Sequence, residues 1–394
     1  MLGLKTLKDV DLSGKRVLIR VDFNVPIDEN QNIVDDTKIK AAIPTINFVL
    51  EKGALLILMS HLGRPKGEKV AKYSLKPVGK HLASLLNYKV KMASDCIGEK
   101  IENEISNLKS GEVLLLENLR FYKEEEENDP QFAHKLASLA DIYVNDAFGS
   151  AHRAHASTAG VAEILPTYAG VLMEKEVNML KNVLEYPESP RMAILGGSKV
   201  ADKLGLIHNL LEKLDIILIG GGMANTFLKA RGYNTGKSRV EEDLLDEANN
   251  LLASARNKGV KILLPEDVVL GREISREAPA IIVDVDEVPN DMMILDIGPK
   301  TIKEFQEEIS KARTIVWNGP LGVYECEQFA NGTKEIAKTM AKSNAVTVIG
   351  GGDSAAAVKN MGLEKGITHI STGGGATLEF LEGLPLPGVL ACSR

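Results

Sequence analysis

Short apolar runs recur along the whole chain, and each is followed by a turn and then by a longer amphipathic stretch. In the first half they cover residues 16–21, 54–60, 112–118 and 141–146. In the second half they cover residues 191–197, 215–221, 261–265, 292–297, 314–319, 346–351 and 367–372. Apolar residues are continuous in these runs rather than alternating, which is typical of strands buried on both faces in parallel sheets.

The stretches between the runs have helical patterns. Residues 241–259 begin with acidic residues, carry Arg256 and Lys258 near their end, and stop at Gly259, as expected for a helix and its dipole. The alternation predicts an α/β protein with two Rossmann-like domains. Each domain is a parallel sheet with helices on both faces, and a hinge helix joins the two.

A chain of 394 residues is too long for a single hydrophobic core. We expect an N-terminal domain over 1–170, an interdomain helix over 171–186 and a C-terminal domain over 187–380. The proline-punctuated stretch 185–191 would be the exit from that helix. The turn-rich segment 381–394 is expected to return to the first domain.

Composition and charge narrow the class of protein. The formal net charge of −7 argues against general binding to nucleic acid or anionic lipid. Three widely spaced cysteines indicate neither a disulfide framework nor a zinc site. No apolar run approaches the roughly 20 residues that span a bilayer. We therefore expect a cytoplasmic protein without nucleic-acid or membrane partners. We also expect a monomer, although composition and charge do not determine the oligomeric state. The charge run KEEEEND at 123–129 is predicted to be a solvated surface loop.

Cationic side chains follow four strands of the first half. Arg20, Arg64, Arg120 and Arg153 each lie at or after a predicted strand end, where open α/β sheets bind their ligands. One such arginine usually forms a surface salt bridge, but four together predict a site for a small polyanion. His152 and His155 have the HxxH spacing of metal ligands, but no nearby Cys, Asp or Glu completes a set, so we do not expect a metal there.

Glycines follow the strands of the second half. These turns begin at Gly196, Gly220, Gly319, Gly350 and Gly373, and together they favour a nucleotide phosphate site. Asp353, which comes directly after three glycines, is a natural Mg²⁺ ligand. Lys199 and Lys203 are expected one helical turn apart, pointing at the same phosphate chain.

Two better-known phosphate motifs do not account for this region. No Walker A sequence is present. The stretch 350–355 matches the GxGxxA dinucleotide fingerprint, but the next strand ends in Ser371-Thr372-Gly373 without the acid that would hold a ribose. An NAD-dependent dehydrogenase is therefore a weakened alternative. A non-catalytic protein with two anion sites is the other alternative.

The motifs themselves resemble those of the phosphoglycerate kinase family, in the right order from about residue 16 to 388. They read RVDFNVP, SHLGRP, LENLRF, NDAFGSAHRAHAS, GGSKVADK, GGGMANTFL, WNGPLGVYE, GGGDSAAA and STGGGATLEFLEG. The resemblance implies reversible, Mg²⁺-dependent phosphoryl transfer from 1,3-bisphosphoglycerate to ADP, giving 3-phosphoglycerate and ATP.

The resemblance also implies which residues do the work. For the phosphoglycerate these are Asp22, Asn24, Lys38, His61, Arg64, Arg120 and Arg153. For the nucleotide they are Lys199, Lys203, Asn318, Pro320, Glu325, Gly351, Gly352, Asp353 and Ser354, with Asp353 also holding the metal. Lys38, Lys199, Gly352 and Gly375, together with the N–H groups of Gly351 and Gly374, would stabilise the moving phosphoryl group.

The chain departs from the family pattern at two positions. Lys38 stands where the family usually has an arginine, which keeps the charge but loses the bidentate fork. Ile294 replaces a glycine near the adenine, and we interpret it as a packing variation outside the site.

The chemistry and the two-domain arrangement lead to two further expectations. The acceptor for ATP is a carboxylate, ionised at neutral pH because its pKa is about 4, so no general base is needed. Transfer requires the two domains to close. The hinge elements would be the 171–186 helix, its exit at Tyr186–Pro190 and the segment Leu384–Gly388.

Overall fold

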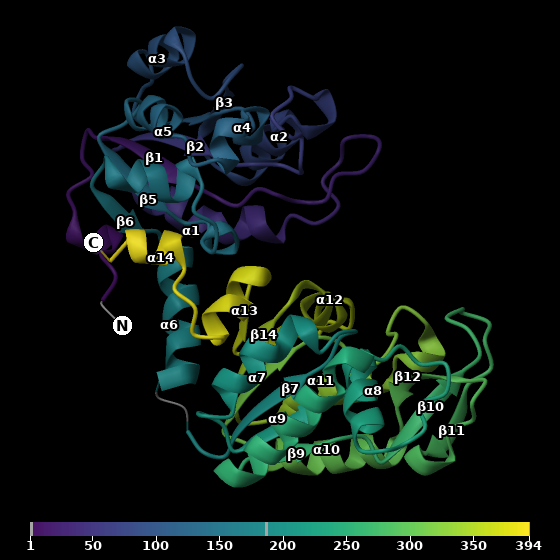
Figure 1. The fold of residues 1–394 in the computed structure, drawn as a ribbon. Helices are drawn as coiled ribbons and strands as arrows, with labels where there is room; N and C mark the ends of the chain where they lie inside the picture. The colour runs from purple at the N-terminus through teal and green to yellow at the C-terminus, as the bar shows by residue number, and fades with distance from the viewer. Residues whose placement is uncertain (1–2, 186–187, 394) are drawn as a thin grey trace. The chain divides into compact units, whose positions relative to one another are not determined.

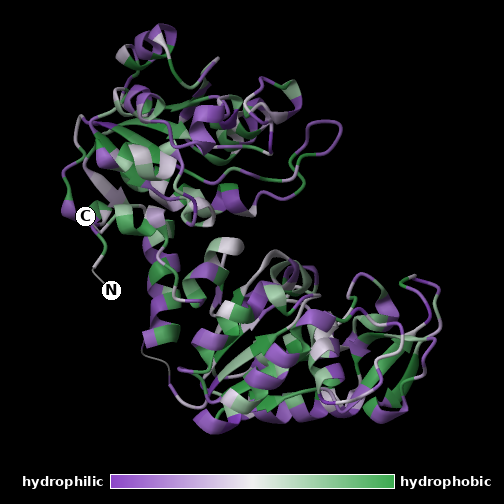
Figure 2. Ribbon diagram, in the orientation of Figure 1, coloured by the Kyte–Doolittle hydropathy of each residue, from purple (hydrophilic) through white to green (hydrophobic). Residues whose placement is uncertain are grey.

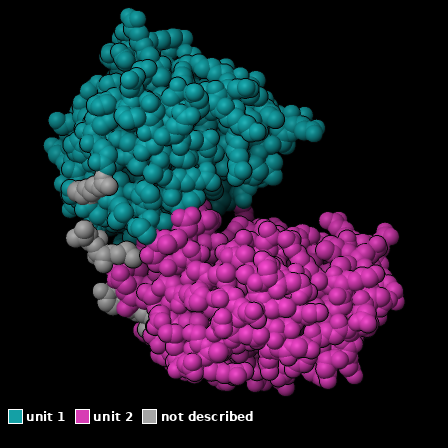
Figure 3. Space-filling model, viewed as in Figure 1, with its two compact units in different colours: residues 1–178, 385–394 teal, residues 179–384 magenta. Residues whose placement is uncertain are grey.

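A computed structural model describes residues 3–185 and 188–393. The chain divides into two compact units: unit 1 comprises residues 1–178 and 385–394, and unit 2 comprises residues 179–384. Figure 3 colours the two units separately, and each is considered by itself below.

Unit 1 is built on a six-stranded parallel sheet (Figure 1). In spatial order its strands are β3 (Lys89–Met92), β4 (Glu112–Leu115), β2 (Leu55–Met59), β1 (Arg16–Arg20), β5 (Ile142–Asn145) and β6 (Thr167–Ala169). The helices of this unit are α1 (Thr37–Glu51), α2 (Lys76–Leu85), α3 (Glu99–Ser106), α4 (Lys123–Glu126), α5 (Pro130–Ala137) and α14 (Pro387–Ala391).

Helices cover both faces of this sheet. Val17 and Ile19 of β1 pack with α1 and α2, whereas Leu18 of the same strand packs with α3 and α5. Alternate residues of β1 thus enter two different cores, which explains why the apolar run is continuous. In Figure 2 the strands are coloured mainly as hydrophobic, whereas the helices carry both hydrophobic and hydrophilic residues.

Unit 2 contains a second six-stranded parallel sheet. Its order is β15 (His369–Ile370), β14 (Val346–Gly350), β13 (Thr314–Asn318), β7 (Arg191–Leu195), β8 (Ile216–Ile219) and β9 (Lys261–Leu263). The helices of this unit are α7 (Leu204–Leu210), α8 (Gly221–Ala230), α9 (Leu245–Lys258), α10 (Pro299–Lys311), α11 (Asn331–Lys342), α12 (Gly352–Asn360) and α13 (Gly375–Leu381). The predicted α/β class with two such sheets is confirmed.

One apolar run that was expected in a parallel sheet forms a strand of a different sheet. The run 292–297 does form a strand, β12 (Met293–Ile297), but this strand belongs to a separate three-stranded antiparallel sheet. The other two strands are β10 (Asp267–Gly271) and β11 (Ile281–Asp284). Neither was predicted, because an apolar run shows burial but does not show which strand it pairs with.

Helix α6 (Val171–Glu185) confirms the helix expected from residue 171 as far as Glu185. The predicted end at Tyr186, and with it the start of the Tyr186–Pro190 exit, lies outside the described residues. The division between the units falls within α6, after Asn178. Helix α9 ends as predicted, because Gly259 adopts the left-handed conformation that terminates a helix (φ 72°).

Hydrogen bonds attach the start of α6 and the returning segment 385–393 to the rest of unit 1. Asp146 follows β5 and accepts hydrogen bonds from the N–H groups of Leu172 (2.9 Å) and Met173 (3.2 Å) at the start of α6. Gly388 in the returning segment donates to the carbonyl of Ala151 (2.8 Å). Asp146 and Ala151, which make these contacts, lie in the segment that follows β5, and Arg153 lies in the same segment.

The charge run 123–129 is not the solvated loop that was predicted. It contains helix α4, and the side chain of Glu125 is fully buried. Glu125 accepts hydrogen bonds from the backbone N–H of Ser157 (2.9 Å) and from its hydroxyl. A single buried acid among exposed ones has partners far along the chain, and the local sequence cannot show them.

Candidate functional site

A small polar pocket opens beside the carboxyl ends of the unit 1 strands, with a volume of about 190 Å³. Its lining consists of Asp22, Asn24, Lys38, His61, Gly63, Arg64, Arg120, Gly149, Ser150 and Arg153. The structure therefore brings together all seven residues expected around a phosphoglycerate, from five separate stretches of the sequence.

The strand order explains this convergence. β1 lies between β2 and β5, with later strands added outward on either side, so the loops after these strands separate at this point. Asp22 and Asn24 follow β1, and His61 follows β2. Asn118 joins two of the loops, because its side-chain oxygen accepts from the N–H groups of Leu62 (3.2 Å) and Arg120 (3.1 Å).

The polar side chains of the pocket are held in place before any ligand arrives. Lys38, in the first turn of α1, forms an ion pair with Asp22 (Nζ to Oδ2, 2.8 Å). The backbone of Gly63 links two others: its N–H donates to Asn24 (2.9 Å), and its carbonyl accepts from Nη1 of Arg120 (2.9 Å). Such prior ordering reduces the entropic cost of binding.

The pocket is strongly electropositive. Burial and the neighbouring cations Arg20, Arg120 and Lys38 hold the pKa of His61 well below its usual value. Burial and nearby arginines likewise lower the pKa of His155 to about 3. Both imidazoles are therefore neutral near pH 7, since each positive neighbour disfavours another charge. An anion bound here would relieve that repulsion.

Arg20, expected with the other three arginines at the anion site, lies in a group of buried residues beneath the pocket instead of lining it; its partners Ser157 and Glu125 were missed. Arg20 is fully buried, and it donates to Ser157 Oγ (Nε, 2.8 Å) and to His61 Nδ1 (Nη2, 2.9 Å). His155 Nδ1 lies 3.9 Å from Glu125 Oε1. In the described part of the chain, no group of three or more His, Cys, Asp or Glu side chains could hold a metal ion.

Unit 2 has a larger pocket, of about 350 Å³, between the glycine turns and the small sheet. Its lining consists of Gly197, Ser198, Gly221, Gly222, Asn225, Ser238, Arg239, Ile274, Met293, Ile294, Leu295, Pro320, Gly322, Val323, Glu325 and Asp353. The apolar side chains form a wall from β12 and the loops beside it. Asp353 contributes an exposed carboxylate in the first turn of α12.

Close backbone packing at the centre of this sheet requires glycine. A Cβ atom at Gly196 would lie 2.1 Å from the carbonyl oxygen of Pro320, which is well inside van der Waals contact. The loops after β7 and β13 therefore meet backbone to backbone, where Gly197 donates to the same carbonyl (2.8 Å). This contact shapes the floor of the pocket.

The expected nucleotide residues are divided between the pocket lining and its surroundings. Pro320, Glu325 and Asp353 line the pocket. Asn318 and Ser354 are buried behind it, and the hydroxyl of Ser354 accepts from the N–H of Gly319 (2.7 Å).

The expected glycines lie at two helix starts. Gly351 and Gly352 lie at the start of α12, and Gly374 and Gly375 lie at the start of α13. Both helix N-termini therefore face the carboxyl edge of the sheet.

The expected placement of Lys199 and Lys203 on one helix was wrong. Lys199 lies in the irregular loop after β7, and helical structure begins only at Ala201. Lys203 is buried, and its ammonium group donates to the side-chain oxygen of Asn318. Burial lowers the pKa of Lys203. The glycine turn delays the helix, so the two lysines do not share a helical face.

Ile294, interpreted as a packing variation outside the site, is buried and is also one of the residues that line the unit 2 pocket. Its backbone N–H donates to the hydroxyl of Ser238 (2.8 Å). Ser238, Arg239 and Asn225 were missed as lining residues. The GGGMANT motif contains Asn225, but no local signal distinguishes it from a core residue.

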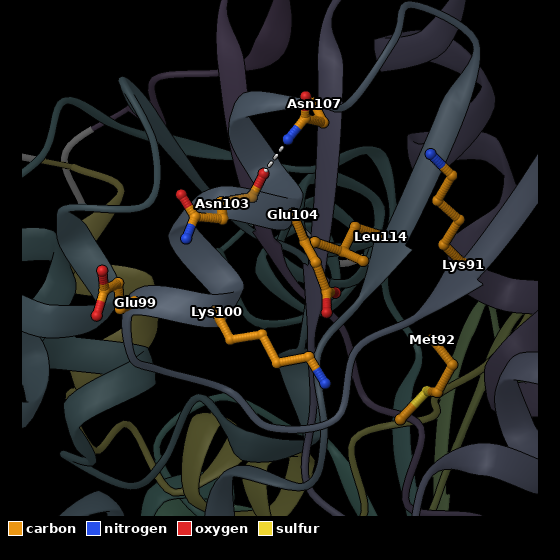
Figure 4. A pocket seen from close by; sticks show the side chains of 8 residues that line it. All are labelled: Lys91, Met92, Glu99, Lys100, Asn103, Glu104, Asn107 and Leu114. Carbon is orange, nitrogen blue, oxygen red and sulfur yellow. Dashed lines mark hydrogen bonds between the residues drawn. The ribbon is translucent and has the colours of Figure 1, made fainter.

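Another pocket of unit 1, with a volume of about 670 Å³, contains none of the predicted residues. It lies between the edge strand β3 and helix α3, where Figure 4 shows Lys91, Lys100 and Glu104 among its side chains. Asn107 donates there to the carbonyl of Asn103 (2.8 Å). Mixed charges and few convergent partners make it a poor anion site compared with the smaller pocket.

Comparison with known proteins identifies a family over almost the whole chain. The family model described as "Phosphoglycerate kinase" matches residues 7–384. The phosphoglycerate kinase of Dictyoglomus turgidum is 59% identical over 384 residues, covering 97% of this chain and 96% of that protein. A protein of Nicotiana tabacum named "Phosphoglycerate kinase, cytosolic" is 55% identical over 390 residues, covering 98% and 97%.

Solved structures of phosphoglycerate kinases have the same fold as this chain. Phosphoglycerate kinase from Coxiella burnetii matches with a TM-score of 0.90 at 41% identity, covering 99% of each chain. The enzyme from Pyrococcus horikoshii matches with a TM-score of 0.86 at 36% identity, covering 99% of this chain and 98% of that one.

Proposed function

The chain belongs to the phosphoglycerate kinase family and catalyses reversible phosphoryl transfer between 1,3-bisphosphoglycerate and ADP, and we propose that each unit binds one of the two substrates. Unit 1 would bind 3-phosphoglycerate or 1,3-bisphosphoglycerate in its cationic pocket, and unit 2 would bind ADP or ATP. The observation that carries this proposal is the convergence of Lys38, His61, Arg64, Arg120 and Arg153 on one pocket without an exposed acid.

In unit 1 the arginines bind the non-reacting phosphate. Their planar forks suit bidentate contacts with phosphate oxygens. His61 is neutral, so it serves as a hydrogen-bond donor to the substrate rather than as a proton acceptor. Asp22 pairs with Lys38 (2.8 Å) and keeps its ammonium group at the pocket rim, where it would face the transferring group.

In unit 2 the nucleotide lies with its base against the apolar wall that includes Ile294 and Val323, and with its phosphates toward Asp353. Mg²⁺ fits this position, because Asp353 offers one exposed carboxylate and Mg²⁺ prefers one or two carboxylates plus phosphate oxygens. When bound, the ion would neutralise phosphate charge. Lys199 and the backbone N–H groups at the starts of α12 and α13 contact the phosphoryl oxygens.

No residue needs to remove a proton. The attacking carboxylate of 3-phosphoglycerate is already ionised, since carboxyl pKa values lie near about 4. The chain therefore contributes positioning and positive charge to the reaction, which is the usual division of labour in phosphoryl transfer. Lys38, Lys199, Gly352 and Gly375 are the groups we assign to the transition state.

We also propose a monomer that works in the cytoplasm. The relative from Nicotiana tabacum carries "cytosolic" in its name. Among the helices that the structure describes, none is long and apolar enough to cross a membrane.

A pair of variants tests the division between the units. Arg153→Lys keeps the charge but loses the fork, and should weaken 3-phosphoglycerate binding roughly tenfold while leaving ADP binding nearly unchanged. Asp353→Ala should weaken Mg-ADP binding and leave 3-phosphoglycerate binding intact. Isothermal titration with each ligand measures both effects. Glu364→Ala, an exposed acid elsewhere in unit 2, is the control. Equal losses for both ligands in either variant would refute the proposal.

A further inference from the structure

Four buried residues form one hydrogen-bonded chain beneath the unit 1 pocket. Glu125 accepts from the backbone N–H and the hydroxyl of Ser157. The same hydroxyl accepts from Nε of Arg20 (2.8 Å), and Nη2 of Arg20 lies 2.9 Å from His61 Nδ1. Arg20, Glu125 and Ser157 are each 0% exposed, and only His61 reaches the pocket.

The direction of each hydrogen bond is determined by chemistry. An arginine side chain has no acceptor, so His61 Nδ1 must accept and cannot carry a proton. A neutral imidazole then carries its proton on Nε2. Nη1 of Arg20 donates to the carbonyl of Val21 (2.5 Å), which holds the guanidinium in this orientation.

A fully buried guanidinium needs a compensating charge. Glu125 is the acid joined to Arg20 through Ser157, and it is equally buried. The pair makes the buried layer neutral as a whole and lets the pocket above it stay cationic. This explains why one acid of the 123–129 run turns inward.

We propose that Arg20, with Ser157 and Glu125, is a positioning group that locks His61 in the Nε2–H tautomer, so that His61 presents a hydrogen-bond donor to the substrate. Arg20 and its two partners act through His61 and need not touch the substrate. The inference rests on the proposed binding of phosphoglycerate in this pocket.

Other charged groups around His61 act in the same sense. Burial lowers its pKa most, and the cations Arg20, Arg120 and Lys38 lower it further. The neighbouring His155 is uncharged near pH 7, and Asp22, Arg64 and Arg153 share the pocket lining. Loss of Arg20 removes both the donor at Nδ1 and one of the positive neighbours. The pKa of His61 should then move toward its ordinary value of about 6.5.

The test uses the full chain labelled with ¹⁵N-histidine, whose ring nitrogen shifts distinguish the two tautomers. In the unaltered protein His61 should show the Nε2–H form without titrating from pH 5.5 to 8. Ser157→Ala keeps the Arg20 donor at Nδ1 and should retain the Nε2–H form. Arg20→Met combined with Glu125→Gln, which keeps the buried layer neutral, should abolish the preference and raise the pKa of His61, because one positive neighbour is lost.

Steady-state kinetics give a second measurement. Relative to the unaltered protein, the Arg20→Met/Glu125→Gln protein should have a KM for 3-phosphoglycerate raised roughly tenfold at pH 8, with the KM for ATP unchanged. The KM of the double variant for 3-phosphoglycerate, divided by that of the unaltered protein, should shrink as the pH falls to 5.5. A protonated His61 then regains a donor and adds positive charge. The ratio also cancels the ionisation of the substrate itself. Ser84→Ala, an exposed serine on α2, is the control and should match the unaltered protein.

The possible outcomes separate the inference from the proposed function. An unchanged tautomer and a pH-independent KM ratio in the Arg20→Met/Glu125→Gln protein would overturn the inference. If 3-phosphoglycerate failed to shift the His61 signals of the unaltered protein, the assignment of phosphoglycerate to this pocket would fall instead. If the double variant does not fold, Arg20→Gln, whose side-chain oxygen can accept from Nδ1–H, decides the tautomer question.

Discussion

Lys38 occupies the position where the family usually has arginine, and its surroundings suggest how a lysine can serve. Its ammonium group is half-buried and paired with Asp22 at 2.8 Å, which compensates for the flexibility of a lysine side chain. Lys38→Ala should lower kcat roughly 10²–10³-fold, the effect of removing one transition-state charge. Steady-state assays with saturating substrates measure it.

The matched control for Lys38 is on the same helix. Lys40→Ala removes an exposed lysine paired with Asp36, and kcat should stay the same. Lys38→Arg should retain most activity. A kcat for Lys38→Ala equal to that of Lys40→Ala would show that Lys38 is an ordinary surface residue.

His155 makes unit 1 sensitive to acid. Its pKa is lowered to about 3 by burial and by Arg120, Arg20 and Arg153, whereas in the unfolded chain it is about 6.5. Between these values the unfolded state binds the extra proton, so stability falls as the pH drops from about 6.5 toward 3. Above pH 6.5 this contribution is fully present.

His155→Gln should therefore reduce the acid sensitivity, by up to about 1.4 kcal/mol per pH unit in that window. Thermal unfolding followed by circular dichroism from pH 4 to 8 measures the slope. His134→Gln, on helix α5 of the same unit, controls for the loss of a histidine elsewhere. Parallel slopes for the unaltered protein and His155→Gln would contradict the argument.

At the scale of elements, the start of α13 depends on an unusual backbone conformation. Gly374 precedes this helix with φ 53° and ψ −113°, which a residue with a Cβ rarely adopts. Nothing lies within 4 Å of a Cβ placed there, so the cost of a side chain is conformational. Gly374→Ala should destabilise the protein by about 1–3 kcal/mol and lower kcat by shifting the N–H groups at the helix start.

Gly352→Ala provides the comparison. Gly352 begins α12, has no positive φ, and also has open space around a Cβ. Its replacement should leave the thermal midpoint nearly unchanged. Equal midpoints for the two alanine variants would rule out backbone strain at Gly374.

At the scale of the whole molecule, the two proposed substrate pockets belong to different compact units. Direct transfer requires the donor and acceptor oxygens to come within a few ångströms while water is excluded. We therefore predict closure of the units, with α6, the chain up to Pro190 and the segment Leu384–Gly388 as hinges.

Small-angle X-ray scattering tests the prediction. The radius of gyration should be smaller with 3-phosphoglycerate and Mg-ATP together than with either alone. The Asp353→Ala protein should contract less under the same conditions. A radius that is constant in all states of the unaltered protein would exclude hinge closure.

The sequence by itself determined the α/β class and most of the strands. Leu18 and Ile57 belong to the core on one face of the unit 1 sheet, and Val144 belongs to the core on the other face. Because helices cover both faces, the strands are apolar at successive positions, and the sequence shows this as continuous apolar runs. It also showed the cationic residues of unit 1, because loops after parallel strands gather at one edge of a sheet.

Only the tertiary structure decided the partners of individual side chains. The pairing of β12 with β10, the inward turn of Glu125, the bond from Lys203 to Asn318 and the exposure of Ile294 to the unit 2 pocket all join residues distant in sequence. A local pattern records whether a residue is buried, but not which atoms meet it. The charge-compensated chain from Glu125 to His61 exists only because folding brings β1, α4 and the loop after β5 together.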